Sequence, residues 1–91
     1  MTTYVVSYDL KKPGQNYQPL WDELDRLKAH RTLESFWLIS VNNTPKELVD
    51  HLKSFIDAND ALWVLELTKV HHFRNAKAGT NDWLAKNPPA R

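Results

Sequence analysis

The chain has 91 residues, a formal net charge of +1 and no cysteine. A chain of this length can bury one hydrophobic core, so we expect one domain whose stability is marginal or shared with a second subunit. The lack of cysteine excludes a disulfide framework, a thiolate metal site and a cysteine nucleophile. Because neither an apolar run of about 18 residues nor a signal-like N-terminal segment is present, we expect a cytoplasmic protein with no membrane span.

The small net charge argues against a strongly basic nucleic-acid-binding protein, but the charge is unevenly distributed. Residues 1–68 contain seven Lys or Arg and ten Asp or Glu, whereas residues 69–91 contain five and one. A basic C-terminal segment attracts phosphates through counterion release. It can equally be a solvated tail that keeps the protein soluble. The sequence leaves both interpretations open.

The first predicted element is an apolar strand over residues 4–10, which places Asp9 where the strand opens into a turn. An acid at the end of a rigid strand is a candidate functional group. Aspartate is also a common turn residue that accepts hydrogen bonds from its own backbone, so a purely structural role is the alternative. Tyr8, its neighbour, is expected on the opposite face of the strand.

An amphipathic helix is predicted over residues 17–29, because apolar residues recur there at three- and four-residue spacing. Asn16 is the expected N-cap, and Pro19 is tolerated in the first turn. The solvated face is expected to consist of Asp22, Glu23, Asp25 and Arg26.

Two further strands and a second helix follow. Residues 31–41 predict one long bent strand or two strands joined by a tight bend, because eleven residues exceed the usual strand length. Thr44, Pro45 and Glu47 form a capping-box pattern that opens a helix ending near Asp57. Residues 61–67 are almost continuously apolar, which is typical of a central strand covered on both faces.

The C-terminal residues 69–91 are predicted as an extension of a core formed by residues 1–68. A short helix over residues 80–86, capped by Thr80 or Asn81, is expected to bury its apolar side chains. The order strand, helix, strand or strand pair, helix, strand predicts an α+β fold. Its form is expected to be a ferredoxin-like βαββαβ sandwich with two helices on one face of an antiparallel sheet.

Histidine and tryptophan offer further candidate functional groups. His71 and His72 are adjacent, so on a strand they would point to opposite faces, and no third ligand stands at a recognisable spacing. We therefore expect an exposed pair near basic neighbours. The four tryptophans are predicted to lie in the core, and only Trp37 and Trp83 are candidates for stacking on bases or on a partner.

These elements, in their order, resemble those of a known family. The features are the strand YVVSYDL, Arg31 followed by Ser35, the aromatic strand from Phe36, the T-P-x-E-L helix start and the turn from Ile56 to Asp60. Over about residues 3 to 68 they are similar to the small CRISPR adaptation nuclease family, the smaller of the two spacer-acquisition proteins, and to the related VapD-type toxins.

The resemblance implies a ferredoxin-like homodimer in which Asp9 of each subunit meets its twin and the pair holds Mg²⁺ or Mn²⁺. Carboxylate oxygen and retained water suit such a hard cation. The implied function is a metal-dependent nuclease acting on RNA or DNA phosphodiesters, with Asp9 as the catalytic residue. Residues expected to contact nucleic acid are Lys11, Lys12, Arg31, Ser35, Arg74 and Lys77.

Other features depart from the family and keep alternatives open. A single aspartate per chain provides few groups for catalysis. The loop from Lys11 to Gly14 contains less arginine than the family leads us to expect, and residues 69–91 lie beyond the matching region. In the family this last segment often crosses to the partner's sheet, so it is expected to complete the dimer. The alternatives are a catalytically inactive dimeric module that binds nucleic acid and a toxin-like or protein-interaction module.

Overall fold

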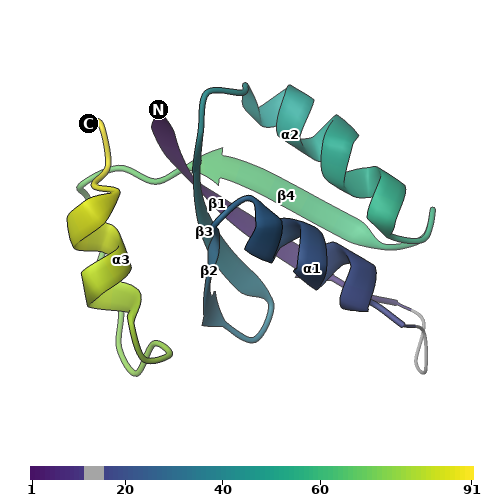
Figure 1. The fold of residues 1–91 in the computed structure, drawn as a ribbon, viewed down its shortest axis with the longest axis horizontal. Helices are drawn as coiled ribbons and strands as arrows, with labels where there is room; N and C mark the ends of the chain where they lie inside the picture. The colour runs from purple at the N-terminus through teal and green to yellow at the C-terminus, as the bar shows by residue number, and fades with distance from the viewer. Residues whose placement is uncertain (12–15) are drawn as a thin grey trace.

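The computed structural model describes residues 1–11 and 16–91. Within them the chain forms four strands, three α-helices and one short 3₁₀ helix (Figure 1). In chain order these are β1 (Thr2–Asp9), α1 (Gln18–Arg26), β2 (His30–Leu33), β3 (Phe36–Val41), α2 (Pro45–Leu52), the 3₁₀ helix η1 (Lys53–Phe55), β4 (Ala61–Glu66) and α3 (Thr80–Lys86).

The strands form one antiparallel sheet in the order β2-β3-β1-β4, so the protein belongs to the α+β class as expected. Helices α1 and α2 lie together on one face of this sheet, and α3 stands apart from them beside β2 (Figure 1). None of the helices in the described ranges is long and apolar enough to cross a membrane.

Local sequence signals explain several element boundaries. The capping box is confirmed: the Glu47 backbone N–H donates to Thr44 Oγ1 at 3.1 Å, and the Thr44 N–H donates to Glu47 Oε1 at 2.8 Å. Residues 31–41 adopt the second of the two predicted forms, since β2 and β3 are joined by a bend at residues 34–35. Asp9 is the last residue of β1, as predicted.

Helix α1 ends three residues earlier than the predicted residue 29. Lys28 has a φ of 62°, and its backbone N–H and that of Ala29 donate to the carbonyls of Asp25 and Leu24. This pattern is a Schellman motif, which closes a helix with a residue in the left-handed region. At the other end, Asn16 lies one position before the N-cap, and its Oδ1 accepts from the Gln18 N–H at 3.0 Å.

The main core lies between the sheet and the helices α1 and α2. It contains alternate residues of β1 and β3 together with the inward leucines of both helices. The Tyr8 hydroxyl is saturated within it: it accepts from the indole N–H groups of Trp21 and Trp37, each at 3.0 Å, and donates to the Glu34 carbonyl at 3.1 Å. The core therefore contains a polar network as well as apolar contacts.

Glu23 does not lie on the solvated face where the sequence pattern places it. It is buried, and its carboxylate is bound by Arg26 of the same helix and by His51 of α2. The Arg26 Nη2 to Glu23 Oε2 distance is 2.6 Å, and the His51 Nε2 to Oε2 distance is 2.5 Å. Hydrogen bonds first from Arg26 and then from His51 lower the pKa of Glu23 to about 2. The prediction missed this burial because α1 periodicity cannot show where α2 will lie.

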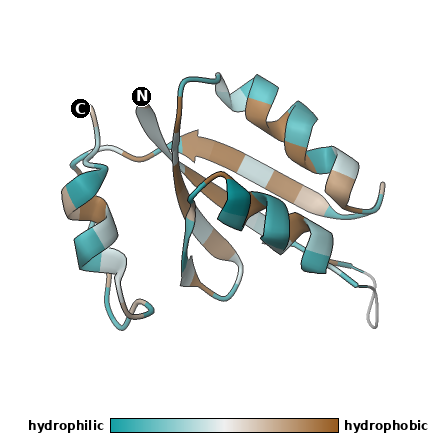
Figure 2. Ribbon diagram, viewed as in Figure 1, coloured by the Kyte–Doolittle hydropathy of each residue, from teal (hydrophilic) through white to brown (hydrophobic). Residues whose placement is uncertain are grey.

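The prediction that residues 61–67 form a central strand of the sheet is wrong. This strand lies at one edge of the sheet, and only one of its faces is covered by α1 and α2. Figure 2 shows a strand that is hydrophobic along most of its length. Its residues alternate between half-buried and exposed, so the apolar run reflects two apolar faces of which the chain covers one.

The short helix α3 forms over the predicted residues, but its cap differs from the prediction. Its N-cap is Gly79, with a φ of 91°, and neither Thr80 nor Asn81 supplies a side-chain cap. A glycine suits this left-handed backbone because a side chain there is strained. The Thr80 hydroxyl instead donates to the Lys77 carbonyl at 2.7 Å and bonds His30 Nε2 at 2.9 Å.

Candidate functional site

The candidate site lies on the sheet face opposite α1 and α2. Tyr4, Val6 and Tyr8 of β1 point into the main core, so by strand alternation Ser7 and Asp9 point to the other side. In the sheet register Ser7 lies between Phe36 of β3 and Trp63 of β4, and Asp9 lies opposite Ala61. We call the surface formed by Ser7, Asp9, Phe36, Trp63 and Leu65 the open face.

The C-terminal segment covers the remainder of this side of the sheet. The Thr3 hydroxyl donates to the Asn87 carbonyl at 2.9 Å, and the indole N–H of Trp83 donates to the Lys28 carbonyl at 3.0 Å. Val5 is only 2% exposed beneath this cover, whereas Trp63 is 71% exposed beyond it. The two ends of the same sheet face therefore differ sharply in burial.

Asp9 lies at the end of β1 with an accessible side chain. Its Oδ2 lies 2.5 Å from Lys11 Nζ, and this hydrogen bond, with the charge attraction, raises the pKa of Lys11. A shallow depression beside it is lined by Ser7, Ala61 and Trp63. Asp9 is thus in contact with a cation and next to an exposed indole.

A second aspartate lies near this strand end, which the sequence analysis did not single out as a site residue. Asp60 Oδ1 accepts from the Lys11 backbone N–H at 2.8 Å and from the Tyr17 hydroxyl at 3.0 Å, and Oδ2 accepts from the Asp57 N–H at 2.9 Å. Burial raises the pKa of Asp60, but these hydrogen bonds outweigh it and lower the pKa. Asp60 therefore holds the loops together around Asp9.

Arg31 and Asp9 are not brought together. The Arg31 guanidinium lies 4.8 Å from the ring centroid of Trp21 and 5.7 Å from that of Trp37, on the α1 side of the sheet. Its Nε and Nη2 donate to the Glu34 carbonyl at 3.0 and 2.7 Å. Ser35 lies in the bend between β2 and β3, where its carbonyl accepts from the Tyr8 N–H.

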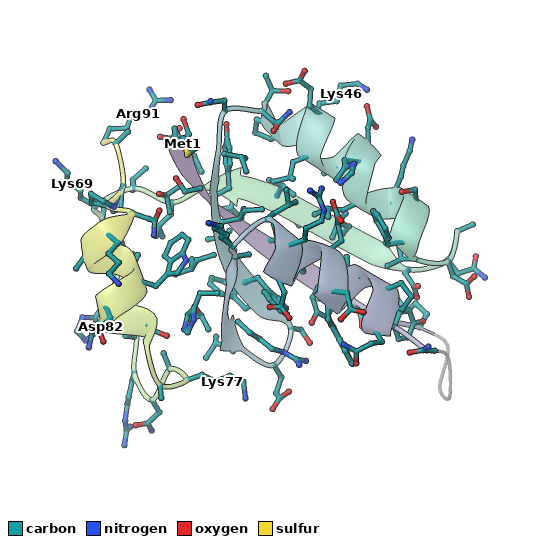
Figure 3. The ribbon with its side chains drawn as sticks, in the orientation of Figure 1. Met1, Lys46, Lys69, Lys77, Asp82 and Arg91 are labelled. Carbon is teal, nitrogen blue, oxygen red and sulfur yellow. The ribbon has the colours of Figure 1, made fainter. Side chains whose placement is uncertain are left out.

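The basic residues of the C-terminal segment are partly neutralised. Lys77 Nζ lies 3.2 Å from Glu34, and Arg91 Nη2 lies 2.8 Å from Glu66. Arg91 and Lys69 lie close together at one end of the molecule, where the Lys69 N–H donates to the Arg91 carbonyl at 2.7 Å (Figure 3). Arg74 lies in the segment between β4 and α3 and lines a cavity there. The predicted contact residue Lys12 lies outside the described residues.

In the described part of the chain, the carboxylates and histidines are not clustered in the way that a metal site of one chain requires. Among residues 1–11 and 16–91 no group of three or more His, Asp or Glu side chains is arranged to hold one. Asp9 has a lysine as its charged partner, and the oxygens of Asp60 already accept three hydrogen bonds. Asp9 alone would leave most of the coordination positions of a bound Mg²⁺ to water or phosphate.

One of the predictions for the tryptophans is wrong: Trp63 was expected in the core but is exposed on the open face. Trp37 lies in the core as predicted, and its 3% exposure leaves no ring face free for stacking on bases. The signal that distinguishes them is the strand position: Trp63 alternates with Leu62 and Val64, which are half-buried and pack against the core. No protein-family model matches the chain, and no solved structure gives a significant match.

Proposed function

We propose that the protein acts as a homodimer of ferredoxin-like domains that associates through the open face. The order β1-α1-β2-β3-α2-β4 with the strand order β2-β3-β1-β4 supports this fold, and α3 is then an addition to it. The observation that carries the proposal is the apolar surface beside Asp9: Trp63 is 71% and Leu65 44% exposed. Apolar side chains clustered on a sheet face are typical of an association surface.

Within this dimer we propose that the two Asp9 side chains form the centre of a nuclease site for RNA or DNA. Asp9 lies on the same face as Trp63, so a two-fold axis through this end of the open face brings the two carboxylates together. The pair would place two carboxylates at one point, whereas the described residues of a single chain form no cluster of three or more metal-ligating side chains. Mg²⁺ or Mn²⁺, when bound there, would neutralise charge on the scissile phosphate.

A second candidate function is nucleic-acid or protein binding without cleavage. It is favoured by the ion pair between Asp9 and Lys11 and by the position of Arg31, which the Glu34 carbonyl holds on the other side of the sheet. In this candidate the open face joins the subunits, and the contacts to a nucleic acid come from Arg74 and its basic neighbours. Such binding would weaken steeply as salt rises.

The dimer is tested by sedimentation velocity on the wild type and the Trp63→Ser variant. We expect the wild type to associate and the variant to be monomeric, because the exposed indole is the largest apolar group on the open face. Val70→Ser is the matched control, since Val70 is 93% exposed but lies outside this face. A monomeric wild type, or equal association of wild type and Trp63→Ser, contradicts the proposal.

The nuclease activity is tested by comparing wild type with Asp9→Asn on end-labelled single- and double-stranded RNA and DNA. The reactions contain Mg²⁺, Mn²⁺ or EDTA, and Asp25→Asn, an exposed acid on α1, is the control for charge removal. Metal-dependent cleavage by wild type and Asp25→Asn alone is the expected result. Cleavage by all three proteins indicates a contaminant, and no cleavage favours the binding module.

A further inference from the structure

A cavity of about 300 Å³ lies between the sheet and the C-terminal segment, away from Asp9. Segment 69–79 runs beside α3, and the helix then returns along it, so the two enclose the cavity against β2 and β3 (Figure 1). Such a volume is at the lower end of the range of small-molecule sites. The lining consists of Thr32, Leu33, Phe36, Leu38, Leu67, His71, His72, Phe73, Arg74, Thr80 and Leu84.

The lining is apolar with a few polar groups, and none of its residues is acidic. Two of the polar groups are already bonded: Thr80 through His30 and the Lys77 carbonyl, and His71 through the Thr68 carbonyl at 2.6 Å. Arg74 is exposed and makes no ion pair with a described residue. The available charge at the cavity is therefore positive.

Thr32 adds an independent observation. It is only 4% exposed, and its hydroxyl is the one buried side-chain polar atom in the described part of the chain without a hydrogen-bond partner. Its backbone is held, because the Thr32 carbonyl accepts from the Lys77 N–H at 2.9 Å. Buried hydroxyls are normally hydrogen-bonded, so the Thr32 hydroxyl retains hydrogen-bonding capacity for a water or a ligand in the cavity that this residue lines.

We propose that this cavity binds a small amphipathic carboxylate, a molecule with a short alkyl or aryl body and one carboxylate group. The body would contact the leucine and phenylalanine side chains of the wall. The carboxylate would accept hydrogen bonds from Thr32 Oγ1 and from the Arg74 guanidinium, which suits a planar anion. The site shares Phe36 with the open face but contains neither Asp9 nor Trp63, and it does not depend on the proposed nuclease activity.

The test uses octanoate as the probe, with 1-octanol and octylamine as neutral and cationic molecules of equal chain length. Each is titrated, below its micelle concentration, into the ¹⁵N-labelled full chain while backbone amide shifts are recorded. We expect saturable shifts at Thr32, Leu38 and Arg74 with octanoate, and binding at least about fivefold weaker with octanol. That factor corresponds to one lost hydrogen bond.

Three variants separate recognition from non-specific adsorption. Arg74→Gln is expected to reduce octanoate binding to the level of octanol, whereas Lys86→Gln, which removes an equal charge outside the lining, is expected to leave it unchanged. Thr32→Val is expected to weaken octanoate binding about fivefold without reducing the stability of the unliganded protein. Trp63→Ser is expected to bind octanoate as wild type does, whether or not the proposed dimer exists.

Three results would overturn the proposal. One is equal binding of octanoate and octanol with no effect of Arg74→Gln, which would show that the cavity does not recognise an anion. Another is a set of shifts centred on Ser7, Asp9 and Trp63, which would show that the alkyl chain adsorbs to the open face. The third is the absence of any saturable shift, which would show that the cavity binds none of the three probes.

Discussion

The two faces of the sheet are covered by different parts of the chain and to different extents. On one face α1 and α2 bury alternate residues of β1 and β3, and Val6 and Ile39 have no exposure. On the other, the C-terminal segment covers Val5 and leaves Trp63 exposed. Both faces carry large apolar side chains. An apolar sequence pattern therefore indicates that a surface is favourably covered, but it does not show whether the same chain or another molecule covers it.

The polar groups on the two faces differ in the same way. On the helix-covered side the Tyr8 hydroxyl and the Glu23 carboxylate are buried and fully bonded within the chain. On the other side Asp9 is exposed beside a single lysine, and the buried Thr32 hydroxyl has no partner among the described residues. Incomplete bonding is therefore concentrated on the side that we propose for association and for ligand binding.

The largest expected effect contrasts the two faces directly. We expect Ile39→Ala to lower the free energy of unfolding by about 3 kcal/mol, because it leaves a cavity in a fully packed core. Leu65→Ala, on the open face, is expected to cost less than about 1 kcal/mol. Urea denaturation in a Trp63→Ser background measures both without a contribution from association. Equal losses would contradict the difference between the faces.

The next largest effect is a pH dependence of the free energy of unfolding that comes from Glu23. Its pKa is lowered from an ordinary 4.5 to about 2, so its contribution to stability is present above pH 4.5 and is lost as pH falls toward 2. We expect Glu23→Gln to lower the free energy of unfolding at pH 7 by on the order of 2 kcal/mol. Denaturation between pH 2 and 7 should show a shallower acid loss in this variant.

The control for Glu23 is Asp25→Asn, which removes an exposed acid from the same helix. This variant is expected to keep the acid dependence of the wild type between pH 2 and 4.5. If Glu23→Gln and wild type lose stability in parallel over that range, the bonds of the Glu23 carboxylate to Arg26 of α1 and to His51 of α2 are not the source of the acid dependence.

A smaller effect is expected from removing the buried hydroxyl of Tyr8. Tyr8→Phe leaves the indole N–H groups of Trp21 and Trp37 without their acceptor, and we expect a loss of about 1.5 kcal/mol. Tyr4→Phe, whose hydroxyl makes one bond to the Asn43 carbonyl at 2.8 Å, is the matched control and should cost about 0.5 kcal/mol. Thermal unfolding of the two variants tests this order, and the reverse order would contradict it.

The smallest effect on folding is expected from Trp63→Ser. Because the indole is exposed in one chain, the free energy of unfolding of the monomer should change by less than about 0.5 kcal/mol. The same variant is the one expected to abolish association. Denaturation at low protein concentration measures the stability of the monomer, and sedimentation measures association. A large loss of monomer stability would show that Trp63 stabilises the fold of the single chain.

The sequence was most informative where structure depends on neighbouring residues. The capping box at Thr44, the strand that ends at Asp9 and the short helix over residues 80–86 were all predicted and are all present. It was least informative about the site: the structure separates Arg31 from Asp9 and occupies Asp60 with loop hydrogen bonds. The roles of Asp9, Ser35, Arg74 and Lys77 toward nucleic acid stay predictions.

By itself, therefore, the sequence determined the kinds of elements and their order, because hydrogen bonds and side-chain periodicity within a few residues decide them. Only the tertiary structure decided that β4 lies at an edge, that Glu23 is buried and that Thr32 lines a cavity. Each of these depends on which distant element packs against a given face. That choice is made by the whole chain, since a strand or helix presents the same pattern whatever comes to cover it.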